Sequence, residues 1–392
     1  MINISKLYLG RDSASDARVS PLRAQPVVVW NCTRRCNLQC VHCYAEASVT
    51  GGANELSTTE GRSLLDDLAA FGAPVVLFSG GEPLLREDLF DLIDHGVKLG
   101  LRAVLSTNGT LIDEKTALRL RDAGVSYAGI SLDGLRETND RFRKAIGGFD
   151  LALRGIRNCL SAGLRTGLRL TVTRDNVADI SGVFDLIEAE RIPRVCFYHL
   201  AYSGRGAAMM HDDLSHEETR RVIDRIIDRT ALLHERGFPV EMLTVDNHAD
   251  GPYLYLRMLR EKRPDAARTL ELLRRNGGNS SGEGIGCVSW DGSVHPDQFW
   301  RSRCLGNVRQ RRFSEIWTDV SNPLLAALRD KRRHVKGRCA RCRFLDACGG
   351  NLRARAEAAT GDTWAPDPAC YLTDKEIAPD ATLRSTRPSR DD

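Results

Sequence analysis

The chain has 392 residues, a hydrophobic content of 42% and a formal net charge of +4. No apolar run approaches the roughly 20 residues of a membrane span, and residues 1–23 lack the apolar stretch and cleavage site of an export signal, so we expect a cytoplasmic protein. The mild charge, the 6% aromatic content and the absence of a basic block argue against nucleic-acid binding.

Short apolar runs alternate with helical patterns between residues 26 and 245. The runs are Val27–Trp30, Val75–Phe78, Ala103–Ser106, Tyr127–Leu132, Leu168–Val172 and Val195–Leu200. Two of the helical patterns begin at capping boxes, Ser57 with Glu60 and Ser215 with Glu218. This alternation is typical of parallel βα units, and active sites of parallel barrels collect at the C-terminal ends of the strands.

The remaining residues form four further segments. Residues 1–25 are an N-terminal segment, and residues 246–286 are predicted to be a connection with one helical pattern, Tyr255 to Arg275, and a Gly/Asn/Ser-rich loop. Residues 287–375 form a second, cysteine-rich region. Residues 376–392 are polar and charged, which predicts a disordered tail.

Twelve cysteines in a chain without an export signal favour metal or redox chemistry over disulfides. Cys36, Cys40 and Cys43 are separated by three and then two residues. A frame shifted to Cys32 would need a cysteine where Gln39 stands. Three thiolates would leave one iron of a four-iron cluster open to a second molecule. A zinc site, which usually takes four ligands, or separate core cysteines are the alternatives.

A glycine pair follows the second apolar run, in Gly80-Gly81-Glu82-Pro83. Glycines allow close approach of the backbone to a ligand, and Glu82 offers a carboxylate to an ammonium group. Taken alone, the motif indicates only a turn. Polar residues also end the later strands; an ordinary turn is the alternative for Asp133-Gly134, and it fits Asn108-Gly109 equally well.

A second cysteine set occurs near the C-terminus. Cys339, Cys342, Cys348 and Cys370 are separated by two, five and twenty-one residues. Four thiolates complete an iron–sulfur cluster with no open iron, which suits electron transfer or structure. A structural zinc held by four cysteines is the alternative that spacing leaves open.

The first cysteine motif, followed one βα unit later by the glycine pair and Glu82, resembles the radical S-adenosylmethionine (SAM) enzymes. The resemblance implies an α/β fold with a partial (β/α)6 barrel over 26–245, and a 4Fe–4S cluster on Cys36, Cys40 and Cys43 whose open iron binds SAM. It places Gly80, Gly81 and Glu82 at the SAM amino group and His42 near its adenine, with Ser131 and Arg143 as further SAM contacts. The cofactors would supply a 5′-deoxyadenosyl radical, and the protein would position the substrate and exclude water.

Residues 287–375 resemble the SPASM/twitch iron–sulfur domain, which implies an auxiliary 4Fe–4S cluster on Cys339, Cys342, Cys348 and Cys370. A full SPASM domain holds two auxiliary clusters. Here Leu352 and Asp297 stand where further cysteines are usual, so we predict one cluster. Cys287 matches a ligand of the missing cluster without its companions. Three other cysteines, Cys159, Cys196 and Cys304, are expected in the core, and a replacement ligand is the alternative for Cys304.

Several longer segments resemble the NirJ family of haem d1 biosynthesis enzymes. They are Tyr198 to Gly206, Thr244 to Tyr253, Gly277 to Gly282 and Trp364 to Cys370. The resemblance implies that two propionate side chains of 12,18-didecarboxysirohaem are removed, leaving oxo groups. It implies an iron tetrapyrrole substrate and a small electron donor such as flavodoxin or ferredoxin. A carboxylate-rich macrocycle calls for Arg, His and Tyr, and the candidate pocket residues are His199, Tyr202, Arg205, His248 and Tyr253.

Two other functions remain open. The first is another radical SAM/SPASM enzyme, either a haem-precursor decarboxylase or a peptide maturase; the short N-terminal segment is too small for a separate peptide-binding domain. The second is an iron–sulfur electron carrier without chemistry of its own, against which the motif around Glu82 argues. Cleavage of SAM by the reduced protein separates the enzyme from the carrier.

Overall fold

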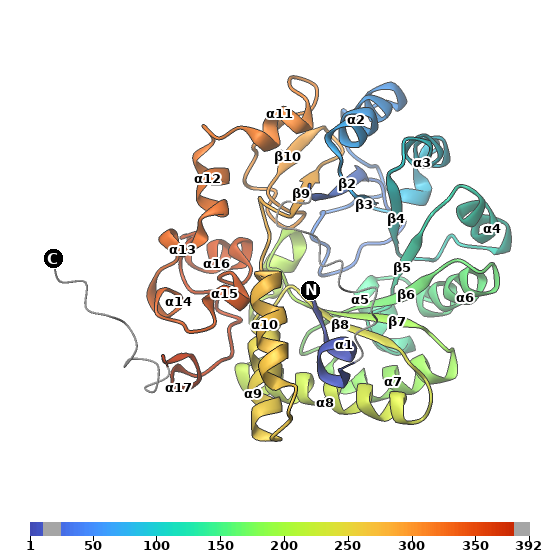
Figure 1. The fold of residues 1–392 in the computed structure, drawn as a ribbon. Helices are drawn as coiled ribbons and strands as arrows, with labels where there is room; N and C mark the ends of the chain where they lie inside the picture. Colours follow the sequence, from blue (N-terminus) through green and yellow to red (C-terminus); the bar gives the residue numbers. More distant parts are fainter. Residues whose placement is uncertain (11–24, 380–392) are drawn as a thin grey trace.

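The computed structural model describes residues 1–10 and 25–379. One sheet of eleven strands curves through this part of the molecule, in the order β1-β8-β7-β6-β5-β4-β3-β2-β9-β10-β11. Strands β2 to β8 run parallel, and helices cover the outer face of the curve (Figure 1). The parallel strands are β2 (Val27–Thr33), β3 (Val75–Gly80), β4 (Arg102–Thr107), β5 (Tyr127–Ser131), β6 (Thr166–Val172), β7 (Arg194–His199) and β8 (Glu241–Val245).

The helices of this barrel pack apolar side chains against the sheet. The N-terminal capping boxes predicted at Ser57 and Ser215 are both formed, and they start α2 and α8. Side chains of α2 such as Leu65 and Leu68 are fully buried, as is Trp30 of β2. The helices are α2 (Thr58–Phe71), α3 (Leu89–Lys98), α4 (Glu114–Asp122), α5 (Arg136–Arg143), α6 (Gly148–Ser161), α7 (Ile180–Ala189) and α8 (His216–Glu235).

The sequence predicted six strands here, and the structure contains a seventh parallel strand, β8. This strand is five residues long and begins with Glu241; its run from Met242 to Val245 is as long as several of the predicted runs and was overlooked. The N-terminal residues are also part of the sheet. The strand β1 (Ile2–Asn3) pairs antiparallel with β8 and leads into α1 (Ile4–Leu9). Residues 11–24 of the predicted N-terminal segment lie outside the described residues.

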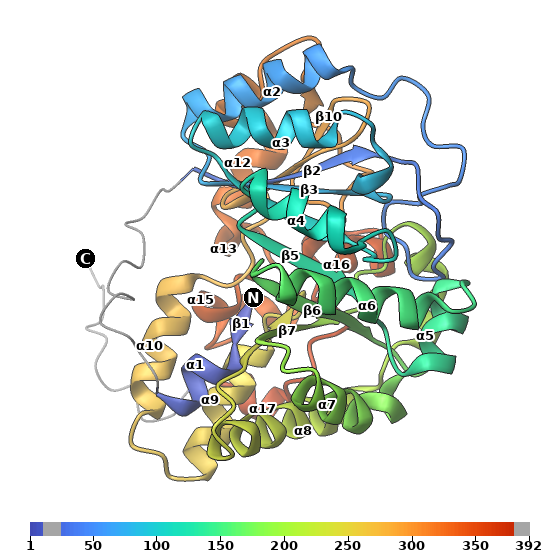
Figure 2. The same ribbon diagram turned by 90° about the vertical axis from the view of Figure 1, so that its right-hand side faces the viewer.

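Two helices, rather than one, occupy the predicted connection over 246–286. They are α9 (Asp250–Arg260) and α10 (Ala266–Asn276). The single helical pattern breaks because Lys262 adopts a positive φ of 55° and Pro264 follows, and proline cannot continue a helix. Figure 2 shows α9 beside α8, and α10 packs against α9 and α15, so this segment is packed structure.

The cysteine-rich region shares the sheet with the barrel. The strand β9 (Ile285–Val288) pairs in parallel with β2, and β10 (Ser293–His295) and β11 (Gly306–Asn307) extend the sheet in antiparallel fashion. Short helices follow: α11 (Phe313–Thr318), α12 (Pro323–Arg329), α13 (Lys331–His334), α14 (Gly337–Ala340), α15 (Leu345–Cys348) and α16 (Arg353–Thr360).

The predicted tail over 376–392 begins inside a folded element. The helix α17 (Asp374–Ile377) starts at a capping box, and its Ile377 is buried. Glu376 of this helix forms an ion pair with Arg220 of α8. Residues 380–392 of the predicted tail lie outside the described residues. Within residues 1–10 and 25–379, no helix is long and apolar enough to cross a membrane.

Candidate active site

Cys36, Cys40 and Cys43 lie together on the loop after β2, at the C-terminal end of the barrel strands. Burial raises the pKa of the Cys36 thiol to about 12, and the neighbouring Cys40 and Cys43 contribute to this rise. All three side chains line one cavity of about 580 Å³. The structure therefore brings the three predicted ligands to one place. The fit of these residues to an iron–sulfur cluster rests on the position of the three thiols around one cavity.

The glycine pair after β3 is required by the close approach of two backbone segments. A Cβ on Gly80 would lie 2.3 Å from the carbonyl oxygen of Thr33, and one on Gly81 would lie 2.2 Å from that of Arg35. The amide of Gly81 donates to Thr33 at 2.7 Å. The glycines thus dock β3 against the cysteine loop, and both also line the cavity of the three cysteines. The sequence had indicated only approach to a ligand.

Glu82 is completely buried directly beneath this loop. Its Oε1 accepts from the Thr107 hydroxyl at 2.7 Å and from the Leu84 amide at 3.2 Å, and its Oε2 accepts from the Asn108 amide at 2.8 Å. Burial raises the pKa of the carboxyl, while these donors lower it. The carboxylate has a fixed orientation at the end of β4. Its contact with the SAM amino group stays a prediction.

A buried carboxylate, Asp133, connects two of the predicted SAM-site residues. It pairs with Arg143 at 2.5 Å and lies 3.4 Å from Nε2 of His42. The His42 ring stacks on Phe142, with centroids 4.5 Å apart. Burial lowers the pKa of His42 to about 4, so this imidazole is neutral. Ser131 lines the same cavity as His42 and Arg143. The sequence marked Asp133 as a polar residue at a strand end, with an ordinary turn as the alternative.

A second cavity of about 780 Å³ continues from the cysteine cavity into the barrel. His42, Ser131 and Arg143 line both. Of the predicted substrate residues, His199 and Tyr202 line this barrel cavity. His199 bonds to Asp250 at 2.9 Å; burial opposes its protonated form, but Asp250 outweighs burial and raises its pKa.

The other three predicted substrate residues do not face the barrel cavity. Arg205 donates to the carbonyl oxygens of Cys40 and Ala47, both at 2.9 Å, and so fastens the cysteine loop from the side. His248 is buried under the C-terminal region, where its amide donates to Asn351 at 2.7 Å. Tyr253 lies on α9 and donates to Asp224 of α8. Helix packing, invisible in the sequence, places His248 and Tyr253 away from both cavities, whereas Arg205 lines the cysteine cavity.

Sequence reasoning missed Arg169, a charged residue inside the apolar run of β6. The register alternation of that strand turns it into the barrel cavity. The signal was a lone charge at an alternating position of an otherwise apolar strand. Asp246, which follows β8, lines the same cavity and was also missed. Burial raises the pKa of Asp246 to about 7.

The second cysteine set converges as well. Burial raises the pKa of Cys348, and Cys370, Cys339 and Cys342 each add to this rise, so the four thiols are mutual neighbours. Within the described ranges, no three His, Cys, Asp or Glu side chains gather as tightly as a single metal ion requires.

Two residues at the ligand positions of the missing auxiliary cluster, Asp297 and Cys287, are buried and hydrogen-bonded within the protein. Asp297 is buried, and its carboxylate accepts from the Ser281 hydroxyl at 2.5 Å and the Phe299 amide at 2.8 Å. Cys287 is buried separately and accepts from the Asn31 side chain at 3.4 Å. This arrangement agrees with one auxiliary cluster, which stays a prediction. Cys304, expected in the core, is instead exposed, because it lies in the loop before β11.

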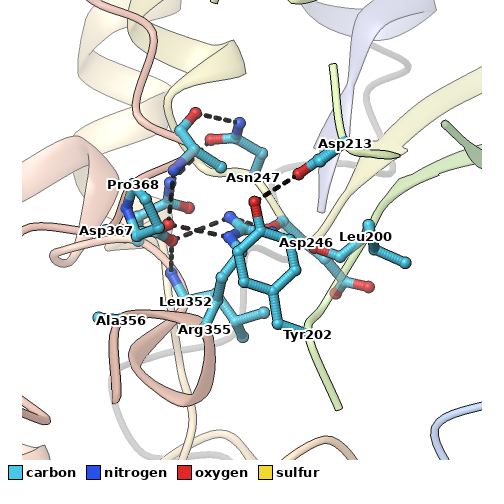
Figure 3. Close-up of polar contacts among 12 residues, drawn as sticks. Leu200, Tyr202, Asp213, Asp246, Asn247, Leu352, Arg355, Ala356, Asp367 and Pro368 are labelled. Carbon is cyan, nitrogen blue, oxygen red and sulfur yellow. Dashed lines mark hydrogen bonds and ion pairs between the residues drawn. The ribbon is translucent and has the colours of Figure 1, made fainter. Parts of the chain in front are cut away.

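A buried ion pair joins the auxiliary region to the barrel (Figure 3). Arg355 and Asp367 bond through two contacts of 2.8 and 2.9 Å, and both side chains are fully buried. The same guanidinium donates to the carbonyl oxygens of Leu200 and Asp246, at the ends of β7 and β8. Asp367 also lies three residues before Cys370. The pair therefore sets the auxiliary cysteines relative to the barrel cavity.

Comparison with known proteins agrees with this geometry. Residues 30–187 match the model of the radical SAM superfamily, and residues 282–343 match that of an iron-sulfur cluster-binding domain, SPASM. The chain is also 57% identical, over 96% of its length, to the Fe-coproporphyrin III synthase of Methanosarcina barkeri, of which it covers 99%. The chain belongs to the radical SAM superfamily.

Other relatives fit the same family. The pre-heme d1 synthase of Dinoroseobacter shibae is 42% identical over 95% of this chain and 93% of its own. Among solved structures, Streptococcus suis SuiB bound to its precursor peptide has a TM-score of 0.72, with 18% identity over 90% of this chain and 77% of its own. Another, anSMEcpe with bound AdoMet, has a TM-score of 0.69, with 20% identity over 90% of this chain and 96% of its own.

This radical SAM enzyme accordingly uses SAM and a 4Fe–4S cluster, and its SPASM domain binds a further iron–sulfur cluster. The predicted fold class, a partial barrel followed by a SPASM-like domain, is confirmed. The electron-carrier alternative falls with the family assignment.

Proposed function

We propose that this enzyme modifies the side chains of an iron tetrapyrrole and that its product is iron coproporphyrin III. The observation that carries the proposal is the 57% identity, over nearly the whole chain, to a protein named Fe-coproporphyrin III synthase. Relatives at 42% and 34% identity are named pre-heme d1 synthase and AdoMet-dependent heme synthase. The common element of these names is a haem-type macrocycle.

In this proposal Cys36, Cys40 and Cys43 hold the cluster that binds SAM. When bound, the cluster and SAM supply a 5′-deoxyadenosyl radical that abstracts hydrogen from a substrate carbon. Support comes from the gathering of the three thiols in one cavity and from the fixed carboxylate of Glu82 beside it. The remaining contacts proposed for SAM are those of Gly80, Gly81, His42, Ser131 and Arg143.

Cys339, Cys342, Cys348 and Cys370 hold the auxiliary cluster in this proposal. The cluster has no open iron, because four thiolates complete it. Asp367 fixes the loop that carries Cys370. The auxiliary cluster passes electrons as the side-chain fragment leaves. A small donor such as flavodoxin or ferredoxin supplies the reducing equivalents.

The cavities suit a macrocycle with carboxylate arms. The barrel cavity is lined by both charged and aromatic side chains, among them Arg169, Tyr198 and Tyr202. A mouth of about 990 Å³ continues outward, bordered by Tyr44, Tyr202, Phe299 and Trp300. Aromatic faces of this kind pack against a planar ring. His199 and Tyr202 are the two predicted substrate residues that the cavity retains.

Formation of the haem d1 precursor is the second candidate, favoured by the segments from Tyr198 to Gly206 and from Trp364 to Cys370 that resemble the NirJ family. The haem d1 reaction differs from iron coproporphyrin III formation in the side chains that are removed. An iron coproporphyrin keeps its propionates, whereas haem d1 formation removes two propionates of 12,18-didecarboxysirohaem and leaves oxo groups. The two outcomes therefore give products of different mass.

The test is anaerobic incubation of the reconstituted protein with SAM, dithionite and 12,18-didecarboxysirohaem, followed by mass spectrometry. We expect 5′-deoxyadenosine together with iron coproporphyrin III. A product that has lost propionates and gained oxo groups assigns the haem d1 reaction instead. Deoxyadenosine without any change in the macrocycle contradicts both. A Cys36→Ala protein is the control, because it should produce neither compound.

A further inference from the structure

Arg169 lies on β6 with its side chain in the barrel cavity, one layer below the strand ends. It is paired in register with Ser131 of β5 and Cys196 of β7. The neighbouring strand β5 has a glycine, Gly129, beside the guanidinium. A Cβ on Gly129 would lie 2.2 Å from its Nε. A residue with no side chain at this position leaves room for the guanidinium. The arginine is therefore built into the barrel wall.

The charge of Arg169 is not neutralised by the protein. Its Nη1 donates to the Ser106 hydroxyl at 2.6 Å, its Nε is buried without a partner, and it forms no ion pair within residues 1–10 and 25–379. The other cations of this cavity, Arg143 and His199, each contact a carboxylate. A cation removed from water is costly unless it is paired, by several kcal/mol in real proteins.

The groups around Arg169 do not act as counter-ions. The titratable groups that act most strongly on its charge are Tyr198, Tyr127, Cys196 and Tyr44, and not the cavity carboxylates Asp133 and Asp246. Burial raises the pKa of each, so these phenols and the thiol are neutral at physiological pH. The cavity thus presents an unpaired positive charge toward whatever fills it.

We propose that Arg169 binds a side-chain carboxylate of the tetrapyrrole, a proposal that rests on the function proposed above. With Nη1 committed to Ser106 and Nε buried, Nη2 is the guanidinium nitrogen left to donate to a carboxylate, and such a charge-assisted hydrogen bond is strong. SAM also carries a carboxylate. Arg169 does not line the cavity of the three cysteines, however, whereas Arg143 does. The substrate is therefore the assigned source.

The test compares two variants with two ligands. Arg169→Met removes the charge and keeps a long unbranched side chain. Arg169→Lys keeps the charge and replaces the planar guanidinium with an ammonium group. Iron coproporphyrin III and its methyl ester are titrated into the reconstituted proteins in the same detergent-containing buffer, and binding is read from the Soret band. Arg157→Met is the matched control, because Arg157 pairs with Glu190 on the outer surface with 58% of its side chain exposed.

Arg169→Met should weaken binding of the free acid by about 10- to 100-fold, since a hydrogen bond to a charged group contributes about 1.5–3 kcal/mol. Binding of the ester should be the same in both proteins. Arg169→Lys should fall between wild type and Arg169→Met, because an ammonium is a single point charge. SAM affinity should not change. The melting temperature of Arg169→Met should equal or exceed that of wild type, because a buried unpaired charge is gone.

Three results would overturn the proposal. Equal losses for acid and ester, together with a lower melting temperature, would assign Arg169 a structural role. Loss of SAM affinity would assign its partner to the SAM carboxylate. Unchanged binding of the free acid would show that the guanidinium does not contact the macrocycle. If wild type itself binds no iron coproporphyrin and converts no tetrapyrrole, the proposed function fails first.

Discussion

The buried pair of Arg355 and Asp367 gives the sharpest test of how the auxiliary region is held. Asp367→Asn leaves the fully buried guanidinium without its counter-ion, and breaking such a pair costs about 3–5 kcal/mol. Unfolding entropy of about 2.1 cal/mol/K per residue converts this, for 392 residues, into a melting-temperature decrease of about 4–6 °C. Replacing both partners, in Arg355→Met with Asp367→Asn, should restore most of the loss because no buried charge remains.

Calorimetry on the reconstituted protein measures the shift, and iron content reports the auxiliary cluster. We expect Asp367→Asn to lose iron as well, because Cys370 lies on the loop that Asp367 anchors through the Ala369 amide. The control is Arg157→Met, whose exposed pair should contribute at most about 1 kcal/mol. A shift for Asp367→Asn no larger than that of the control, with full iron content, would refute this account of the pair.

Three further predictions follow from the cysteines and from Asp246. Cys36→Ala should abolish SAM cleavage and lower the iron content, while the cluster of the SPASM domain remains visible in the absorption spectrum. Cys339→Ala should lower the iron content and leave SAM cleavage in place; an unchanged iron count would contradict the auxiliary site. Burial raises the pKa of Asp246 to about 7, so the native state binds more protons than the unfolded state between about pH 4 and 7, and stability falls as pH rises through that window. Asp246→Asn should lack this decline in urea titrations across the window, and parallel curves would contradict it; Asn suits the positive φ of 67° at this position.

Local signals in the sequence were sufficient for much of the barrel. Both capping boxes start their helices as predicted, because a cap depends on residues three positions apart. The six apolar runs became strands, because each run is long enough to be recognised without its neighbours. The run of β8 was overlooked in the sequence, and the pairing of this strand with β7 identifies it in the structure. The break between α9 and α10 was available in Pro264 and was overlooked.

The sequence alone determined which residues carry the chemistry of this protein: cysteine spacing and the glycine pair with Glu82 are local patterns, and local patterns survive without a fold. Tertiary structure decided which polar residues meet the cavity. It turned Arg169 and Asp246 inward, gave Asp133 two partners, and placed His248 and Tyr253 elsewhere. The reason is physical. Which way a side chain faces is set by strand register and helix packing across the whole chain, and no short stretch of residues contains that information.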